Sequence, residues 1–250
     1  MPVGKKAEIF YAPLINGRKW KTMGSNRRYA IPMGNTIDFA AEADAFRVLL
    51  DSAPNEQTLQ AYIKQGERWF IPYTIQNESQ FKLNSMQYLY EELPLQEKYV
   101  ADYALLGENS DGYHLILVEF ESPAEEQFLL KNSDGEIEVV RNGFIQIADW
   151  QRWLDYNRLS FLDSIGLIDK GIKIPSDRTH YCLVVSRRSF EERVQAKKSQ
   201  LQADKNLTIM SYDRLADGIE LLSSVYYCPE CYRTVEADAT ACRKGCVASN

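Results

Sequence analysis

The sequence predicts an α/β or α+β fold in which helices cover a mixed central sheet. Two near-continuous apolar runs, YHLILVEFES at 113–122 and HYCLVVSRR at 180–188, are typical of buried central strands. Segments with apolar residues at helical spacing precede, separate and follow these runs. Because the two kinds of segment alternate along the chain, we expect the helices to pack on the faces of one sheet.

The N-terminal part, residues 1–53, is expected to be an arm followed by a helix. Residues 1–35 contain glycines and prolines between short strand-like runs, which indicates a hairpin or an extended arm. Residues 36–52 have the composition and apolar spacing of a helix. A second domain is expected over 54–224, and Asn55 is the predicted N-cap of a helix that runs to about Gly66.

The middle of the chain supplies the expected strands. The run 87–93 fits either a strand or a short helix, KYVADYALLG at 98–107 fits a strand, and NSDG at 109–112 fits a turn. Residues 124–142 are expected to be an insertion, and 142–157 an amphipathic helix.

The C-terminal half continues the alternation of helices and strands. Residues 158–178 are expected to form a loop or a broken helix. Ser189, with Glu192 three residues later, has the pattern of a capping box for a charged helix. Residues 207–222 predict a short strand, a turn and a helix.

Composition and charge limit the classes of function that the chain can have. The chain has 250 residues, of which 45% are apolar and 26% charged, and these are ordinary globular values. No stretch approaches the roughly 18 apolar residues that span a bilayer, and no apolar run follows the first lysines, so we expect a cytoplasmic protein without a membrane segment. The net charge of −6 counts against a nonspecific nucleic-acid binder.

The charges are unevenly distributed along the chain. Basic residues dominate 1–30, and the middle, 78–126, is acidic. A second basic stretch contains Arg187, Arg188, Arg193, Lys197 and Lys198. Acids between basic flanks would suit a metal site served by phosphate-binding edges, whereas ordinary solvated faces explain the pattern equally well.

Three carboxylates in the middle are candidate metal ligands. Asp102 lies in one predicted strand, and Glu119 and Glu121 share a face of the next, because side chains two apart on a strand point the same way. Neighbouring strands lie about 4.8 Å apart, so Asp102 can stand beside Glu119. Such a carboxylate group suits Mg²⁺ or Mn²⁺. The alternative is an edge strand with one polar face toward water.

The order of these segments resembles a known family. Asp102 in VADYALL, then LVEFESP, QIADWQRWLDYN, LVVSRRSF and SYDRL, with TLQAYIKQGERWFIP upstream, is similar to the C-terminal nuclease domain of the Shedu anti-phage family over roughly 54–222. That family belongs to the PD-(D/E)XK superfamily. The resemblance therefore implies a restriction-endonuclease-like fold, a DNA substrate and a homo-oligomer.

The resemblance also implies roles for individual residues. Asp102 matches the first metal-binding acid, Glu119 the acid of the E-x-K element, Gln146 the glutamine of the following helix, and Glu92 a preceding acid. In the implied reaction the carboxylates of Asp102 and Glu119 and the main-chain carbonyl of Phe120 hold Mg²⁺. Glu121 and Gln146 orient the attacking water.

One position departs from the superfamily pattern. Glu121 stands where lysine is usual, and a glutamate cannot supply positive charge. It can serve as a further metal ligand or a general base, or it can mark lost activity. Two hypotheses follow: a DNA endonuclease or nickase acting in anti-phage defence, or a catalytically degenerate module that binds DNA or a partner.

The last part of the chain, 225–250, is expected to be a small zinc module. Its cysteines are spaced C-x2-C-x10-C-x3-C and are Cys228, Cys231, Cys242 and Cys246. Four thiolates at such spacing are typical of a structural Zn²⁺ site, and a redox CxxC is the alternative. Cys182 stands alone in an apolar run and is expected to be buried.

Two other enzyme classes are disfavoured. His114 and His180 are the only histidines of the sequence, and no motif places a serine or cysteine nucleophile beside either of them. A glycine-rich phosphate loop is also missing from the sequence, which argues against a nucleotide triphosphatase.

Overall fold

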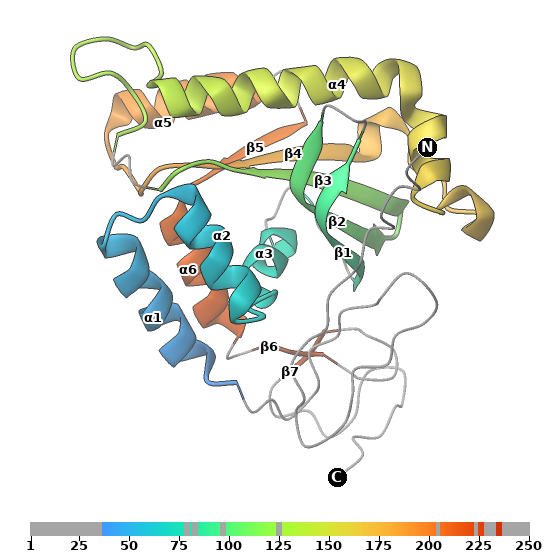
Figure 1. The fold of residues 1–250 in the computed structure, drawn as a ribbon, viewed down its shortest axis with the longest axis horizontal. Helices are drawn as coiled ribbons and strands as arrows, with labels where there is room; N and C mark the ends of the chain where they lie inside the picture. The colour runs from blue at the N-terminus through green and yellow to red at the C-terminus, as the bar shows by residue number, and fades with distance from the viewer. Residues whose placement is uncertain are drawn as a thin grey trace.

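The computed structural model describes residues 37–77, 81, 89–95, 99–123, 127–203 and 206–222, and the backbone of 85–88, 225–227 and 234–236 (Figure 1). The predictions made for 1–35 and for the four C-terminal cysteines fall outside these residues. The short strands β6 (Val225–Tyr227) and β7 (Thr234–Glu236) pair antiparallel with each other.

The central sheet has five strands that follow one another in chain order. They are β1 (Ser85–Pro94), β2 (Val100–Asn109), β3 (Gly112–Phe120), β4 (Thr179–Val184) and β5 (Leu207–Met210). The first three are antiparallel and the last three are parallel, so the predicted mixed sheet is confirmed. The run 87–93, which the sequence left open, is part of strand β1.

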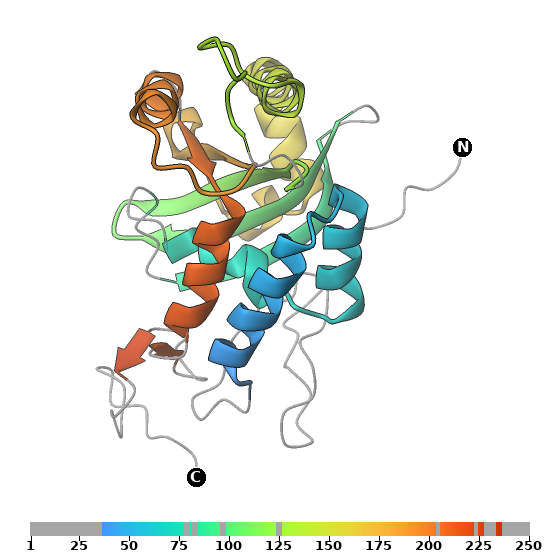
Figure 2. The same cartoon turned by 90° about the vertical axis from the view of Figure 1, so that its left-hand side faces the viewer.

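Helices cover both faces of this sheet, as expected (Figure 2). One face carries α4 (Glu138–Ser164) and α5 (Glu192–Ala203). The other carries α1 (Phe39–Asp51), α2 (Glu56–Gln65), α3 (Phe70–Tyr73), the 3-10 turn η1 (Thr74–Asn77) and α6 (Tyr212–Leu221). Each face has its own apolar core, because successive residues of a strand point to opposite sides.

Local sequence signals explain where several elements begin. Asp38 caps α1 by accepting a hydrogen bond from the Ala41 amide at 3.0 Å. The predicted cap of α2 is confirmed, since Asn55 accepts from the amide of Thr58 at 2.8 Å. The predicted turn between β2 and β3 is also confirmed, and it ends on Gly112 with a φ of 117°. This left-handed backbone favours glycine.

Helix α4 is longer than its sequence indicates. It begins at Glu138, inside the predicted insertion, and continues to Ser164, through the first part of the predicted loop. Both expected boundaries are therefore wrong. The apolar face continues at each end through Val140 and Phe161, which are buried, and their burial keeps these turns against the sheet. Short 3-10 turns, η2 (Ile168–Lys170) and η3 (Ser176–Arg178), occupy the rest of the predicted loop.

The predicted capping box at Ser189 is wrong as well. The Ser189 hydroxyl accepts a hydrogen bond from the amide of Glu191 at 3.2 Å, and α5 begins only at Glu192. The serine therefore forms a local turn that begins three residues before the helix, which is the competing use of a short hydroxyl side chain.

Helix α1 belongs to the same apolar core as α6. Ala43 and Phe46 are buried in it, and Arg47 forms ion pairs with Asp217 at 3.3 Å and Glu220 at 2.6 Å.

Over the part of the chain that the structure describes, no helix has the length and apolar character needed to cross a membrane.

Candidate active site at the ends of the central strands

Three acidic positions form a row across β1, β2 and β3. The antiparallel register pairs Tyr103 with Val118, which places Asp102 opposite Glu119. On the other side of β2, the register of β1 places Glu92 opposite Asp102. The row runs across the sheet where β2 begins and β3 ends, which is the arrangement expected for Asp102 and Glu119 from the sequence.

Glu121 extends this row beyond the end of β3, on the side of the sheet covered by α4. A Cβ atom built on Gly143 of α4 would lie 3.1 Å from the Cγ of Glu121 and 2.5 Å from the Cδ1 of Leu183. A methyl group at this position would require the side chains of Leu183 and Glu121 to shift. Glycine at this position therefore makes room for the Glu121 side chain.

The main chain at the strand ends is held by hydrogen bonds from side chains. The amide of Phe120 donates to the Oδ2 of Asp102 at 2.7 Å. The hydroxyl of Tyr212, at the start of α6, donates to the carbonyl of Glu121. Ser186, just beyond β4, is buried and has a φ of 59°, a strained backbone for a non-glycine residue. The two hydrogen bonds hold the backbone that carries Glu119 and Glu121.

Burial, together with the charges of neighbouring acids, raises the pKa of three carboxyl groups at this site. Burial, followed by the charges of Asp102, Glu121 and Glu56, raises the pKa of Glu119 to about 10. Burial also raises the pKa of Asp102 to about 7, although the Phe120 amide acts in the opposite sense. The pKa of Glu121 rises to about 7 through burial and the charges of Glu56 and Asp102. Such shifts are typical of carboxyl groups that share one site.

Glu119 is the least satisfied of these groups. Its side chain is 7% exposed, and its Oε2 atom is buried without a hydrogen-bond partner. A buried acceptor without a partner costs on the order of 1–3 kcal/mol. A cation beside it would remove this cost, and hard carboxylate oxygens are the donors that Mg²⁺ and Mn²⁺ prefer.

As they stand, the side chains are not arranged as a finished metal site. Among the described residues, no group of three or more His, Cys, Asp or Glu side chains is placed so that it could hold an ion. Asp102 is engaged by the Phe120 amide. The donor chemistry thus fits a divalent ion, which the carboxylate oxygens of Asp102 and Glu119 would hold.

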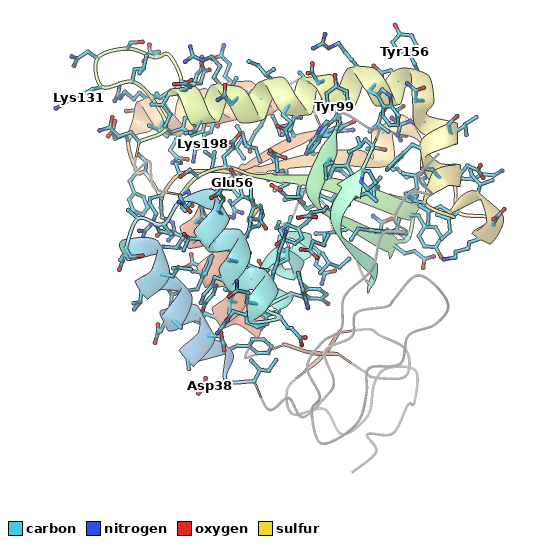
Figure 3. All side chains as sticks on the ribbon, viewed as in Figure 1. Asp38, Glu56, Tyr99, Lys131, Tyr156 and Lys198 are labelled. Carbon is cyan, nitrogen blue, oxygen red and sulfur yellow. The ribbon has the colours of Figure 1, made fainter. Side chains whose placement is uncertain are left out.

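Glu56 is a further acid of this site that the sequence did not reveal. It is the first residue of α2, and its charge acts on Asp102, Glu119 and Glu121. Figure 3 shows it at the end of α2 that faces the sheet. An acid in the first turn of a helix is usually explained by the helix dipole, so its type and position carried no distinct signal.

Gln146 lies in the wall of an open pocket of about 320 Å³, whose lining includes neither Asp102 nor Glu119. Tyr99 and Val100, which precede Asp102, form one side of the pocket, and α4 forms the other through Asn142, Ile145, Gln146 and Asp149. The neighbouring Trp150 is buried. The contribution of Gln146 to the acid cluster stays a prediction.

The basic stretch 187–198 forms ion pairs with acids of the same chain. Its pairs are Arg187 with Asp51 and Asp213, Arg188 with Asp217, Arg193 with Glu191, and Lys197 with Glu136. Lys198 is buried, with its Nζ 4.8 Å from the ring centre of Phe128. These contacts favour a structural role for the stretch over a phosphate-binding edge.

Comparison with known proteins identifies the family of this chain. Residues 53–216 match the model of the family described as "Shedu protein SduA, C-terminal". A solved structure of the restriction endonuclease FokI is similar at 15% identity and a TM-score of 0.35, over 86% of this chain and 35% of the FokI chain. A search of curated proteins returned no match. The family match extends over more than half of the chain, which therefore belongs to the Shedu family and carries its C-terminal domain.

Proposed function

We propose that this chain is a metal-dependent DNA nuclease, an endonuclease or nickase that hydrolyses phosphodiester bonds in anti-phage defence. One observation carries the proposal: buried carboxylates stand in register on neighbouring strands, and a buried oxygen of Glu119 has no partner. Membership of the Shedu family supports the same function.

The roles of the residues follow from their positions. Asp102 and Glu119 would hold Mg²⁺ or Mn²⁺, with Glu56 and Glu121 close enough to add negative charge. The ion, when bound, supplies a more acidic water and stabilises negative charge on the phosphate. Glu121, whose pKa of about 7 leaves it partly ionised near neutral pH, can accept a proton from the attacking water. We assign Gln146 to orienting that water or the adjoining nucleotide.

The test is cleavage of plasmid and phage DNA with Mg²⁺, Mn²⁺ or EDTA. We expect metal-dependent nicking that falls by about 10³-fold or more in Asp102→Asn and in Glu119→Gln, because each loses a ligand charge. Asp111→Asn is the matched control, since Asp111 is exposed in the turn at the opposite end of β2 and β3. Equal cleavage by all three variants would contradict the proposal.

A second candidate function is a degenerate nuclease fold that binds DNA or a partner without cutting. The substitution of the usual lysine by Glu121 is the observation that favours it. DNA binding by the wild type that is retained in EDTA, with no cutting in either metal, would select this function. The homo-oligomer that the family resemblance implies is tested in parallel by light scattering.

We propose further that Cys228, Cys231, Cys242 and Cys246 bind a structural Zn²⁺ ion. Their spacing supports this site. Mass spectrometry of the purified protein should detect about one zinc per chain, lost in Cys228→Ser. Cys182→Ala is the control, because Cys182 is buried in the sheet and should not affect the zinc content. Zinc retained in Cys228→Ser would contradict this assignment.

A further inference from the structure

Helix α2 presents one stripe of polar residues toward the strands that carry the acids. Glu56, Gln60 and Lys64 follow at intervals of four residues and therefore share a face of the helix. Glu56 acts on the acids of β2 and β3, and the Oε1 of Gln60 accepts a hydrogen bond from the hydroxyl of Tyr103 at 2.7 Å. The next turn brings the ammonium group of Lys64 to the edge of the sheet.

Lys64 is held there by two neighbouring glutamates of β1. Its Nζ lies 3.0 Å from the Oε1 of Glu91 and forms a second ion pair with Glu92. Glu92 occupies the position of β1 opposite Asp102. The Lys64 ammonium group is therefore bound to a residue of the acidic row itself.

The backbone of Glu92 is unusual for an edge strand. Its φ is 47°, in the left-handed region that non-glycine residues rarely adopt. Strained backbone of this kind is concentrated at functional sites, where the surrounding structure maintains it. Here the strained residue is the one that joins the acidic row to Lys64.

The electrostatic interactions of the acids also point to Lys64. The described acids of the cluster repel one another, and Lys64 acts on Asp102 in the opposite sense. The other basic groups that the sequence suggested, in the stretch 187–198, are engaged elsewhere. A phosphodiester group brings further negative charge to this end of the sheet, so a cation beside it would stabilise both the bound and the reacting phosphate.

We propose that Lys64 supplies the positive charge that contacts the phosphate at the acidic row, and that Glu91 and Glu92 hold this lysine until DNA binds. The inference rests on the proposed nuclease function and adds a residue to it. No proton or bond is exchanged by Lys64. Its ion pairs outweigh burial and raise its pKa, so the side chain is charged at neutral pH.

Cleavage kinetics give the first test. Lys64→Met should lower the maximal cleavage rate by about 10²-fold, as the loss of one group that stabilises transition-state charge commonly does. Lys64→Arg should recover part of the rate, because it keeps the charge. Lys131→Met is the matched control, since Lys131 is an exposed lysine on a loop far from α2 (Figure 3). Cleavage by Lys64→Met at the wild-type rate would overturn the inference.

DNA binding without metal separates a phosphate contact from a structural ion pair. In EDTA, Lys64→Met should weaken binding and reduce the slope of log K against log salt by about 1. Glu92→Gln should strengthen binding, because it removes a competitor of the phosphate for Lys64. If the ion pair were only structural, both variants would destabilise the fold and change DNA binding in the same direction, which would contradict the inference.

These outcomes also distinguish the inference from the function on which it rests. A wild-type protein that never cuts DNA removes the nuclease proposal, while the opposite effects of Lys64→Met and Glu92→Gln on binding would still show Lys64 at a phosphate. If the wild type cuts DNA and Lys64→Met cuts equally well, the role of Lys64 is contradicted while the nuclease proposal stands.

Discussion

The two ends of strand β3 differ in whether their buried polar side chains have hydrogen-bond partners. Near its start, His114 and His180 stack with ring centres 5.3 Å apart, and the Nδ1 of His114 lies 3.0 Å from the Nε2 of His180. The Nε2 of His114 in turn contacts the Oδ1 of Asn109 at 3.1 Å. At the other end, Glu119 is buried beside further acids, and one of its oxygens has no partner.

This difference in hydrogen bonding distinguishes a packing role at one end of β3 from a binding role at the other. The histidine end is satisfied by neighbouring side chains, so it needs nothing from outside the chain. The acidic end carries like charges in a buried place, an arrangement that costs stability unless a cation binds. Proteins often retain such unfavourable groups where they bind or react, which supports our proposal that the acidic end is the functional one.

The largest stability effect of this contrast is expected at Glu119. The pKa of this carboxyl is about 10 in the fold and near 4.5 when unfolded, so the folded protein binds the extra proton between these values. Stability contributed by this proton falls as the pH rises from 4.5 toward 10. In EDTA at pH 8, Glu119→Gln should be more stable than the wild type by about 1–3 kcal/mol in urea unfolding. A less stable variant would contradict the account.

The histidine end should respond to pH in the opposite direction. Burial and the charge of His114 lower the pKa of His180 to about 4, below its ordinary value of 6.5. The unfolded chain therefore binds more protons between these values, and stability is lost as the pH falls from 6.5 toward 4. The loss attributable to His180 should be about 1–2 kcal/mol. His180→Gln should remove it, and an unchanged pH dependence would show that the pair does not titrate this way.

A smaller effect is expected from two glycine substitutions, one beside Glu121 and one on the other face of the sheet. Gly143→Ala puts a methyl group near Glu121 and Leu183, and Gly218→Ala puts one 2.7 Å from the Cβ of Thr74 on the other face. Alanine favours the helix by about 1 kcal/mol, which offsets part of either clash. Both variants should stay within about 1 kcal/mol of each other in stability. DNA cleavage should fall only in Gly143→Ala, and equal activity of the two would contradict a role for Glu121.

Much of the fold was predictable because it depends on local signals. The apolar runs identify β3 and β4, and the short polar side chain of Asn55 identifies the start of α2. The failures lie where tertiary packing decides. The ends of α4 follow burial of Val140 and Phe161, and Ser189 bonds to a nearer amide than the helix would offer.

The acids of the site were only partly predictable. Asp102 and Glu119 follow from two adjacent strands, because a hairpin turn fixes the register between them. Glu56 and Lys64 lie on a helix that reaches the sheet through long-range packing, and a single sequence contains no signal of that contact. The acids that pair with the basic stretch 187–198 could not be predicted for the same reason, since Asp51 and Asp213 lie far from Arg187 in the sequence.

Titration of Mn²⁺ into protein that has been stripped of loosely bound metal tests the central claim most directly. Isothermal calorimetry should detect about one ion per chain in the wild type and in Asp111→Asn, with tighter binding at higher pH because the carboxyl protons must leave. Binding should be lost in Asp102→Asn and Glu119→Gln. Mn²⁺ bound equally by all four proteins would contradict a metal site at the acidic row.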